Sequence, residues 1–304
     1  MRIFITGGNG LVGNAVTSLL LQQGHEVTHM QRQAGPDGFH DGKVHTILAD
    51  GTGSGPWQDE MISHDVVINL AGATIFTRWN EKNKSLIYKS RILTTRNIVQ
   101  ALERKGNRVT RFISTSAVGY YGPHGDEFLD EEELPGNDFL AVVTRDWEGE
   151  ARQAERSGVS TAITRFGIVL SEKGGALGQL IPLFRRGLGS PLGTGRQWFS
   201  WIHHEDLARI ILFLIDSTRI QGPVNCTAPV PVTNRELTTV LARVLGRPAF
   251  LPAVPSFALK LALGEFASVL LGGQRAVPTR LLGEGFSFSH GSLAEALEDI
   301  LKAR

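Results

Sequence analysis

The chain has 304 residues with a formal net charge of +1, and 41% of its residues are hydrophobic. This length suits one large α/β domain with a smaller appended part, and the near balance of charges excludes a nucleic-acid footprint. No apolar run approaches the length of a membrane span, and the single cysteine excludes an intramolecular disulfide.

The chain opens with a strand, a glycine-rich turn and a helix. The apolar run Ile3–Ile5 precedes the turn Thr6–Gly13, and a helix is predicted over Leu11–Gln23. In dinucleotide-binding folds such glycines allow a tight turn, close approach of a pyrophosphate and close packing of helix on strand. This context favours a dinucleotide site over an ordinary glycine turn. The expected cofactor contacts are Thr6, Gly7, Gly10, Leu11, Val12 and Gly13.

The next predicted strand, Glu26–Met30, bears on the choice of dinucleotide. NAD sites usually place an acidic residue about 20 positions after the glycines, whereas NADP sites place an arginine nearby. Here Arg32 follows the strand, and no acidic residue lies between Val27 and Gly35. Because a guanidinium can hold a 2′-phosphate that a carboxylate would repel, Arg32 favours NADP(H) over NAD(H). A solvated surface arginine is the alternative.

Apolar runs with helices between them recur through the first half of the chain. They lie at Ile3–Thr6, Glu26–Met30, Lys43–Leu48, Asp65–Leu70, Arg111–Ser114 and Ser160–Arg165. Because these runs are continuously apolar, they predict strands that are covered on both faces. Long helices are predicted over Glu81–Lys105 and Phe139–Ser157. The alternation predicts an α/β fold with a Rossmann-type doubly wound parallel sheet.

After Arg165 the pattern becomes richer in glycine and proline, which indicates loops. The elements expected there are a helix at Leu177–Arg186, a strand and helix within Trp198–Ile215, a strand at Val224–Thr227, and helices at Thr233–Leu245, Ser256–Leu271 and Ser292–Lys302. We therefore predict a Rossmann domain over residues 1–228 and a small, mostly helical C-terminal lobe over 229–304. Residues 167–200 are expected to contribute to the substrate side of that lobe.

Two of the predicted strands end in residues suited to a ligand site. Leu70, Ala71 and Gly72 are small or apolar residues at a strand end, where a cofactor can approach the backbone. The following strand ends in Ser114-Thr115-Ser116, whose hydroxyls can hydrogen-bond a substrate oxygen.

With the glycine turn, these blocks resemble the extended short-chain dehydrogenase/reductase superfamily, and within it the YfcH-like epimerase family proteins. The blocks that carry this resemblance are Asn69-Leu70-Ala71-Gly72, Arg78-Trp79-Asn80, Ser90-Arg91, Gly119-Tyr120-Tyr121-Gly122, Trp147-Glu148, Gly174-Gly175-Ala176-Leu177, Ser200-Trp201-Ile202-His203, Gly273-Gln274-Arg275 and Pro278-Thr279-Arg280. The resemblance covers nearly the whole chain, and its tail is similar to the family's C-terminal domain of unknown role. The epimerase label itself follows from likeness of fold.

The superfamily's catalytic pair, a Tyr followed four residues later by a Lys, does not occur in this chain. The residues four positions after the three tyrosines are Ile92, His124 and Gly125. On the helix that would carry the pair, Leu140 or Ala141 stands for the Tyr and Thr144 or Arg145 for the Lys. Arg145 could hold ribose hydroxyls, although an arginine does not shuttle a proton. The preceding helix has Ser90-Arg91 where the superfamily often has an Asn.

Three groups are candidates for the chemistry that remains. Ser116 matches the superfamily's catalytic Ser, and Tyr121 could supply an acid if it points into the cleft. The alternative for Tyr121 is structural packing with one hydrogen bond. His203 has an imidazole suited to proton transfer, but relatives use this block mainly to tether the substrate lobe, with Asp206 capping or bridging the helix. With His203 assigned to the substrate side and Arg145 added from the following helix, the catalytic candidates are Ser116, Tyr121 and Arg145.

A second set of side chains is expected near the cleft. Arg78, Arg91 and Arg196 could bind an anionic ligand, and Trp79 and Trp201 an aromatic one. Loop-anchoring tryptophans and solvated arginines are the alternative. The predicted substrate contacts are Arg78, Trp79, Arg91, Trp201 and His203. His204 and Glu205 have no further ligands at useful spacing, so no metal site is predicted.

Two function classes follow. One is an NADP(H)-dependent oxidoreductase or epimerase that acts on an unidentified small polar substrate. The other is a catalytically silent NADPH-binding sensor or scaffold, as the missing Tyr and Lys suggest. The resemblance is compatible with a homodimer. Because a strand is expected from residue 2, no signal peptide is predicted, and a cytoplasmic location or the mature form in an organelle matrix is expected.

Overall fold

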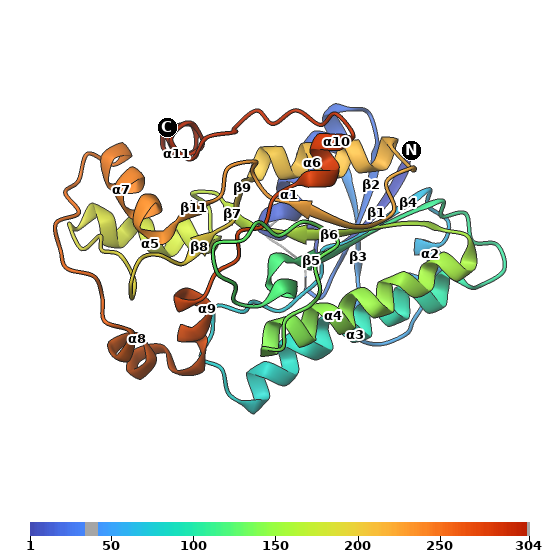
Figure 1. The fold of residues 1–304 in the computed structure, drawn as a ribbon. Helices are drawn as coiled ribbons and strands as arrows, with labels where there is room; N and C mark the ends of the chain where they lie inside the picture. The colour runs from blue at the N-terminus through green and yellow to red at the C-terminus, as the bar shows by residue number, and fades with distance from the viewer. Residues whose placement is uncertain (34–41, 303–304) are drawn as a thin grey trace.

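A seven-stranded parallel sheet forms the centre of the computed structural model, which describes residues 1–33 and 42–302 (Figure 1). The strand order is β10-β6-β5-β4-β1-β2-β3. The strands are β1 (Arg2–Thr6), β2 (Glu26–Gln31), β3 (Val44–Leu48), β4 (Val66–Asn69), β5 (Arg111–Ala117), β6 (Ser160–Phe166) and β10 (Gly222–Cys226). The predicted doubly wound Rossmann-type sheet is confirmed.

Strand burial explains why the apolar runs form this sheet. β1 pairs with β2 on one side and β4 on the other, so that Ile3 lies opposite Val27 and Val66. Ile3, Val27 and Val66 are all buried in one apolar cluster. Since β1 and β4 are consecutive in the sheet although two strands separate them in sequence, their carboxyl ends form the switch point where such sheets bind ligands.

Five helices cover the two faces of this sheet. α1 (Leu11–Gln22) and α6 (His204–Asp216) pack on one face, and α2 (Trp57–Met61), α3 (Glu81–Leu102) and α4 (Phe139–Arg152) lie on the other (Figure 1). α3 begins after Asn80 and α4 after Asp138, whose side chains accept hydrogen bonds from backbone N–H groups of the first turn. α4 stops earlier than predicted, because Gln153–Ser157 forms a 3₁₀ helix.

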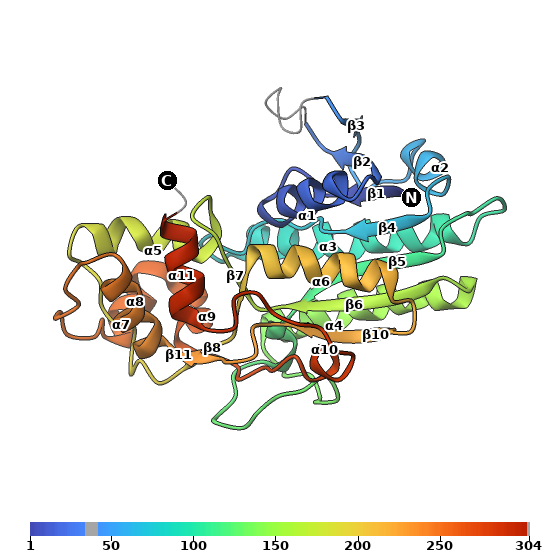
Figure 2. The same cartoon turned by 90° about the horizontal axis from the view of Figure 1, so that it is seen from above.

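The later part of the chain builds a second lobe beside the sheet (Figure 2). Its core unites α5 with the C-terminal helices α7 and α11. The elements of the lobe are α5 (Gly175–Arg185), β8 (Trp198–Phe199), β11 (Val232–Thr233), α7 (Asn234–Val244), α8 (Ser256–Leu263), α9 (Ala267–Leu271) and α11 (Leu293–Lys302). The single helix predicted over Ser256–Leu271 is wrong, because Gly264 adopts φ +63° and divides it.

Three short elements connect the lobe to the sheet. β7 (Ile168–Leu170) pairs with β9 (Trp201–His203), which leads directly into α6. Farther along, α10 (Thr279–Gly283) packs against the edge strand β10. β7 and β9 thus meet beyond the carboxyl end of β6, whereas Arg280 of α10 donates to the carbonyl oxygens of Gln221 and Pro223 at the beginning of β10. Over the described residues, no helix has both the length and the apolar character of a membrane span.

Candidate functional site

The glycine turn joins β1 to α1 in a conformation that other residues could not adopt. Gly7 has φ +72°, and a Cβ placed on it would lie 2.9 Å from the backbone carbonyl carbon of Leu70. A Cβ on Gly13 would lie 2.5 Å from the carbonyl oxygens of both Gly7 and Gly8. The turn thus presses closely against both β4 and the first turn of α1.

The amino terminus of α1 is suited to an anion. Gly10 is its N-cap and has no side chain, and the first turn contains no acidic residue. The N–H groups of this first turn therefore have no side-chain cap, and they add to the positive end of the helix dipole. This is the arrangement in which helices bind phosphate groups.

A buried hydrogen-bond chain holds the strand ends beside this turn. The Thr6 hydroxyl donates to Asn69 Oδ1 over 2.7 Å, and Asn69 Nδ2 donates to the Thr95 hydroxyl over 2.8 Å. The Ala71 N–H donates to Thr6 Oγ1 over 3.3 Å. Thr6 therefore links β1 to β4, a structural role that sequence reasoning missed. The signal was Asn69, a polar residue at the end of an otherwise apolar run.

Arg32 follows β2 at the same edge of the sheet and is exposed. Its charge acts on Asp50, which follows β3. The pKa of Asp50 is lowered first by the hydrogen bond from the Thr52 N–H and to a smaller extent by Arg32. The local sequence around Arg32 could not reveal this carboxylate, because the strand pairing brings it near. Residues 34–41, next to Arg32 in sequence, lie outside the described ranges.

Arg91 lies on α3 against the segment that leaves β4. Its Nη1 donates to the carbonyl oxygens of Ala73 and Ile87, each over 3.0 Å. The neighbouring Ser90 hydroxyl accepts the Ala73 N–H over 3.0 Å. A Cβ on Gly72 would lie 3.0 Å from the Arg91 Cζ, so this position admits the guanidinium because it is a glycine. Burial lowers the pKa of Arg91 to about 10.

Ser116, at the end of β5, belongs to a buried charged network. Its hydroxyl donates to Glu148 Oε1 over 2.7 Å. Arg165, 1% exposed, forms a two-point ion pair with the same carboxylate over 2.8 and 3.0 Å. Such side-on pairing gives both buried groups charged hydrogen-bond partners. The Glu148 carboxylate therefore fixes the Ser116 hydroxyl. The sequence analysis did not predict that Glu148 and Arg165 lie next to Ser116.

Tyr121 is fully buried, and its hydroxyl is engaged on all sides. The oxygen lies 2.7 Å from Asn225 Oδ1 and 2.8 Å from the Asp130 carbonyl oxygen, and it accepts from Arg165 Nη1 over 3.0 Å. Burial raises the pKa of Tyr121 to about 12. The geometry agrees with the structural alternative and opposes a role as proton donor in an open cleft.

The register of α4 places its two candidate residues differently. Thr144 is buried, and its hydroxyl donates to the Leu140 carbonyl oxygen over 2.8 Å. Arg145 is half exposed and pairs with the adjacent Asp146, with 3.1 Å between Nη2 and Oδ1. The structure therefore leaves Arg145 on the accessible side of the helix.

Three of the predicted substrate contacts are core residues. Trp79 packs edge-on against Phe139 and Phe266, and its indole N–H donates to the Ile75 carbonyl oxygen over 3.1 Å. Trp201 is fully buried and donates to the Val230 carbonyl oxygen over 3.0 Å. These tryptophans anchor segments of the chain and do not line a cleft. Of the predicted set, Arg78 and Arg91 retain access to a ligand.

His203, also predicted to contact substrate, is fully buried in a cluster with His290 and Asp299. Its Nδ1 accepts the Glu205 N–H over 3.2 Å, and its ring stacks on His290 with centroids 3.8 Å apart. Burial, with the neighbouring imidazoles, lowers the pKa of His203 to about 4. A neutral ring that accepts at Nδ1 carries its proton on Nε2, which lies 3.3 Å from Asp299 Oδ2.

The same cluster is the group of described residues that comes nearest to a metal site. One ligand atom from each of His203, Glu205, His290 and Asp299 lies within 4.8 Å of the others. The prediction that Glu205 has no other possible metal ligands near it is wrong. His290 and Asp299 lie far from Glu205 in sequence, so spacing along the chain could not show that they are its neighbours. With its proton on Nε2, however, His203 offers no lone pair toward the cluster.

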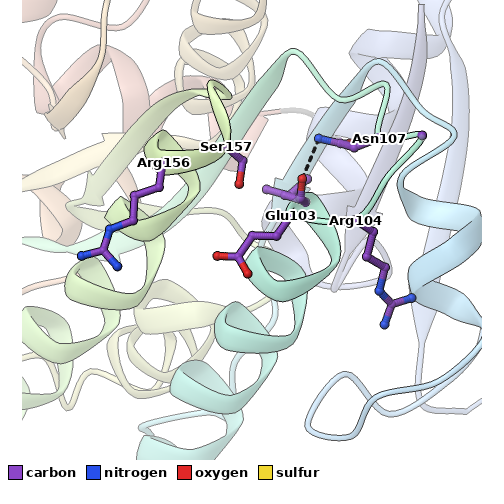
Figure 3. Close-up of a pocket in the computed structure, with 7 residues that line it drawn as sticks. Glu103, Arg104, Asn107, Arg156 and Ser157 are labelled. Atoms are coloured by element: carbon purple, nitrogen blue, oxygen red, sulfur yellow. Dashed lines mark hydrogen bonds between the residues drawn. The ribbon is translucent and has the colours of Figure 1, made fainter.

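One surface hollow of the described residues lies away from the carboxyl edge of the sheet. It has a volume of about 540 Å³ and is lined by residues at and just after the end of α3 and by the 3₁₀ helix that follows α4, among them Glu103, Asn107 and Arg156 (Figure 3). These residues precede β5 and β6, so the hollow lies at the amino edge of the sheet. The glycine turn, Arg91 and Ser116 all lie at the carboxyl edge, where parallel sheets bind ligands.

Comparison with family models gives two matches. The model described as the NAD dependent epimerase/dehydratase family matches residues 3–226. A second model, described as a domain of unknown function (DUF1731), matches residues 254–300.

Relatives of full length are also found. The epimerase family protein YfhF of Bacillus subtilis is 38% identical over 305 residues, which cover 100% of this chain and 99% of that protein. The epimerase family protein SDR39U1 of Mus musculus is 38% identical, with 99% of this chain and 100% of that protein covered.

Two solved structures illustrate the similarity. The human epimerase family protein SDR39U1, in a crystal structure with NADPH, superimposes with a TM-score of 0.88 at 32% identity and covers 100% of both chains. The UDP-glucose 4-epimerase of Thermus thermophilus, in complex with NAD, superimposes with a TM-score of 0.78 at 18% identity, covering 100% of this chain and 99% of that one. The second likeness concerns the fold alone.

Proposed function

The chain belongs to the NAD dependent epimerase/dehydratase family, and from this premise we propose that it binds NADP(H) in preference to NAD(H) and acts on a small polar substrate. The reaction class is oxidoreduction or epimerisation at a carbon that carries an oxygen. The observation that carries the proposal is the uncapped amino terminus of α1 above the closely packed glycine turn.

The cofactor contacts follow from this turn. The N–H groups of Leu11, Val12 and Gly13 would hold the diphosphate, and the backbone from Leu70 to Gly72 would lie along the ribose and nicotinamide side. That the human relative was crystallised with NADPH supports NADPH as a ligand of this chain. When bound, the cofactor would supply the hydride that the side chains of this chain cannot supply.

Arg32 supports the preference for NADP(H). It stands at the end of β2, exposed, where the adenosine ribose lies in this kind of fold. A guanidinium there would bind the 2′-phosphate by charge-assisted hydrogen bonds. Asp50 partly offsets this charge, so we expect the preference to be finite rather than absolute.

The protein groups nearest the expected reaction site hold and orient rather than transfer protons. The hydroxyl proton of Ser116 is donated to Glu148, so that Ser116 Oγ retains lone pairs with which to accept from a substrate hydroxyl. Arg145 and Arg78 are accessible cations that could hold ribose or substrate oxygens. The proposal assigns no tyrosine to the proton transfer.

A two-part experiment tests the proposal. Titration with NADPH and NADH should show tighter binding of NADPH by about tenfold or more. Incubation with NADPH and panels of carbonyl compounds and sugar nucleotides should then show oxidation of the cofactor with at least one compound. Equal affinity for the two cofactors would contradict the assignment of Arg32.

A silent NADPH-binding sensor or scaffold is the second candidate. The observation that favours it is the engagement of Ser116 and Tyr121 in buried contacts, together with the absence of a Tyr and Lys pair from the sequence. Tight NADPH binding without turnover across both panels would select this candidate. A cytoplasmic location and a homodimer remain part of the proposal, and light scattering of the purified protein would test the homodimer.

A further inference from the structure

One arginine at the carboxyl edge of the sheet has no acidic partner. Among the described residues, no carboxylate lies within ion-pair distance of Arg91, although this residue is half-buried between α3 and the segment that leaves β4. The face of the Trp147 indole lies 5.2 Å from its Cζ. A half-buried cation with neither a counter-charge nor acceptors for all its N–H groups can bind an anionic ligand, unlike the fully buried Arg111, whose donors are engaged by carbonyl oxygens and Ser160.

The hydrogen bonds of Arg91 show which of its edges is free. Nη1 is used by the Ala73 and Ile87 carbonyl oxygens, which fixes the guanidinium plane. Within the described ranges, Nε and Nη2 have no hydrogen-bond partner. These two atoms form the side-on fork that matches the two oxygens of a carboxylate or phosphate.

The position of this fork separates it from the diphosphate cradle. Gly72 lies directly beneath the guanidinium, and Leu70 contacts Gly7 of the glycine turn, so the fork and the turn share one edge of the sheet. They approach that edge from opposite faces, because α1 lies on one face and α3 on the other (Figure 1). A dinucleotide whose diphosphate rests on α1 would therefore leave the fork on its far side.

We propose that Arg91 binds an oxyanion of the substrate, a carboxylate or a phosphate, through its Nε and Nη2 edge. The proposal rests on the proposed function and names the substrate class for the same site. Gly72 makes room for the guanidinium, while Ser90 and Ala73 hold the backbone around it. The substrate would then supply a negative charge next to the Arg91 guanidinium, where the described residues place no carboxylate.

The test uses inorganic phosphate and malonate as probes, titrated calorimetrically into the full-length protein saturated with NADP⁺. The variant Arg91→Gln should weaken binding of at least one probe by about tenfold or more, and it should change the NADPH dissociation constant by no more than about twofold. Arg96→Gln is the matched control. Arg96 lies five residues farther along α3, is exposed and pairs with Glu150, so both affinities should stay unchanged.

Several outcomes would overturn the proposal. They are unchanged probe binding in Arg91→Gln, absence of probe binding by the unmodified protein, or a loss of NADPH affinity as large as the loss for the probes. The last outcome would assign Arg91 to the cofactor's phosphates. If Arg91→Gln does not fold, Arg91→Lys keeps the charge but loses the fork, and it should weaken the probe by about threefold or more.

Failure of the proposed function would look different. It would appear as absence of NADPH binding by the unmodified protein, and the probes can then be titrated into the cofactor-free protein with the same variants. A loss of probe affinity confined to Arg91→Gln would still support the oxyanion fork.

Discussion

Two arginines near the carboxyl edge of the sheet, the buried Arg165 and the half-buried Arg91, have opposite surroundings. Arg165 pairs side-on with Glu148 and also contacts the Tyr121 hydroxyl, so every charge around it is compensated within the fold. Arg91 has two carbonyl acceptors and no carboxylate. Arg165 therefore belongs to a network that stabilises the fold, whereas we propose that Arg91 binds a ligand.

A compensated charge contributes to stability only through its partner, and removal of either member exposes the other to an apolar environment. Arg111 shows that carbonyl oxygens can satisfy a buried arginine without a carboxylate, whereas Nε and Nη2 of Arg91 have no such acceptor among the described residues and can bind a ligand. The comparison therefore predicts losses of stability at Arg165 and losses of binding around Arg91 and the glycine turn.

The largest expected effect is on the compensated side. Arg165→Leu should lower the free energy of unfolding by about 3 kcal/mol, because it leaves the buried Glu148 with only the half-exposed Arg152 as an ion-pair partner. Urea denaturation measures this value. The control Arg185→Leu breaks the partly exposed pair with Glu172 and should cost less than about 1 kcal/mol. Equal losses in the two variants would remove the distinction between buried and exposed pairs.

His203 extends the comparison to a buried base that desolvation keeps neutral. Its pKa of about 4 lies below the ordinary value of 6.5, so the folded protein binds fewer protons than the unfolded chain between these values. Its contribution is present above pH 6.5, falls as the pH drops toward 4, and amounts to on the order of 3 kcal/mol.

Denaturation curves between pH 7 and pH 4 check this contribution. His64 and His204 also have lowered pKa values, so a non-titrating variant is needed to isolate His203. His203→Asn keeps an acceptor for the Glu205 N–H and should show a shallower loss of stability over the same range. An unchanged slope in His203→Asn would show that other groups carry the pH dependence.

On the ligand side, Gly13→Ala should weaken NADPH binding roughly 100-fold, about 2.7 kcal/mol. The added Cβ would meet two carbonyl oxygens at 2.5 Å, so α1 must move away from the glycine turn. Fluorescence titration with NADPH measures the change. Gly149→Ala on α4 is the control, because nothing lies within 4 Å of its Cβ position, and it should bind NADPH normally.

The smallest expected effect concerns cofactor choice. Arg32→Asp should weaken NADPH by about tenfold or more, because a carboxylate would repel the 2′-phosphate. The affinity for NADH should change little, since NADH lacks that phosphate. Paired titrations of both cofactors measure the ratio, and Arg32→Lys should retain most of the preference. A parallel loss for both cofactors would mean that Arg32 acts on the shape of the site.

The regular elements of the sheet could be predicted from sequence because their causes are local. Continuous apolar runs such as Ile3–Thr6 bury both faces of a strand, and the glycines of the turn have steric roles that depend on their immediate neighbours. The prediction of one helix over Ser256–Leu271 was wrong for a reason that is also local. Gly264 adopts a positive φ, which the apolar pattern of the segment does not indicate.

The site candidates fared differently, because a side chain's accessibility depends on distant residues. Trp79, Trp201 and Tyr121 are residue types that often contact ligands. In the folded chain, however, Trp79 packs on Phe266, Trp201 donates to the Val230 carbonyl oxygen, and Tyr121 hydrogen-bonds Asn225.

By itself, the sequence determined the parallel α/β fold, the glycine turn at the first helix and the lack of a Tyr and Lys pair, since each depends on residue types at short spacing. Tertiary structure alone decided which polar groups are compensated. Whether a charge such as that of Arg91 or Arg165 has a partner depends on strands and helices that meet only after folding. The energy of the charge depends on its distance from an opposite charge, and residue order alone does not give that distance.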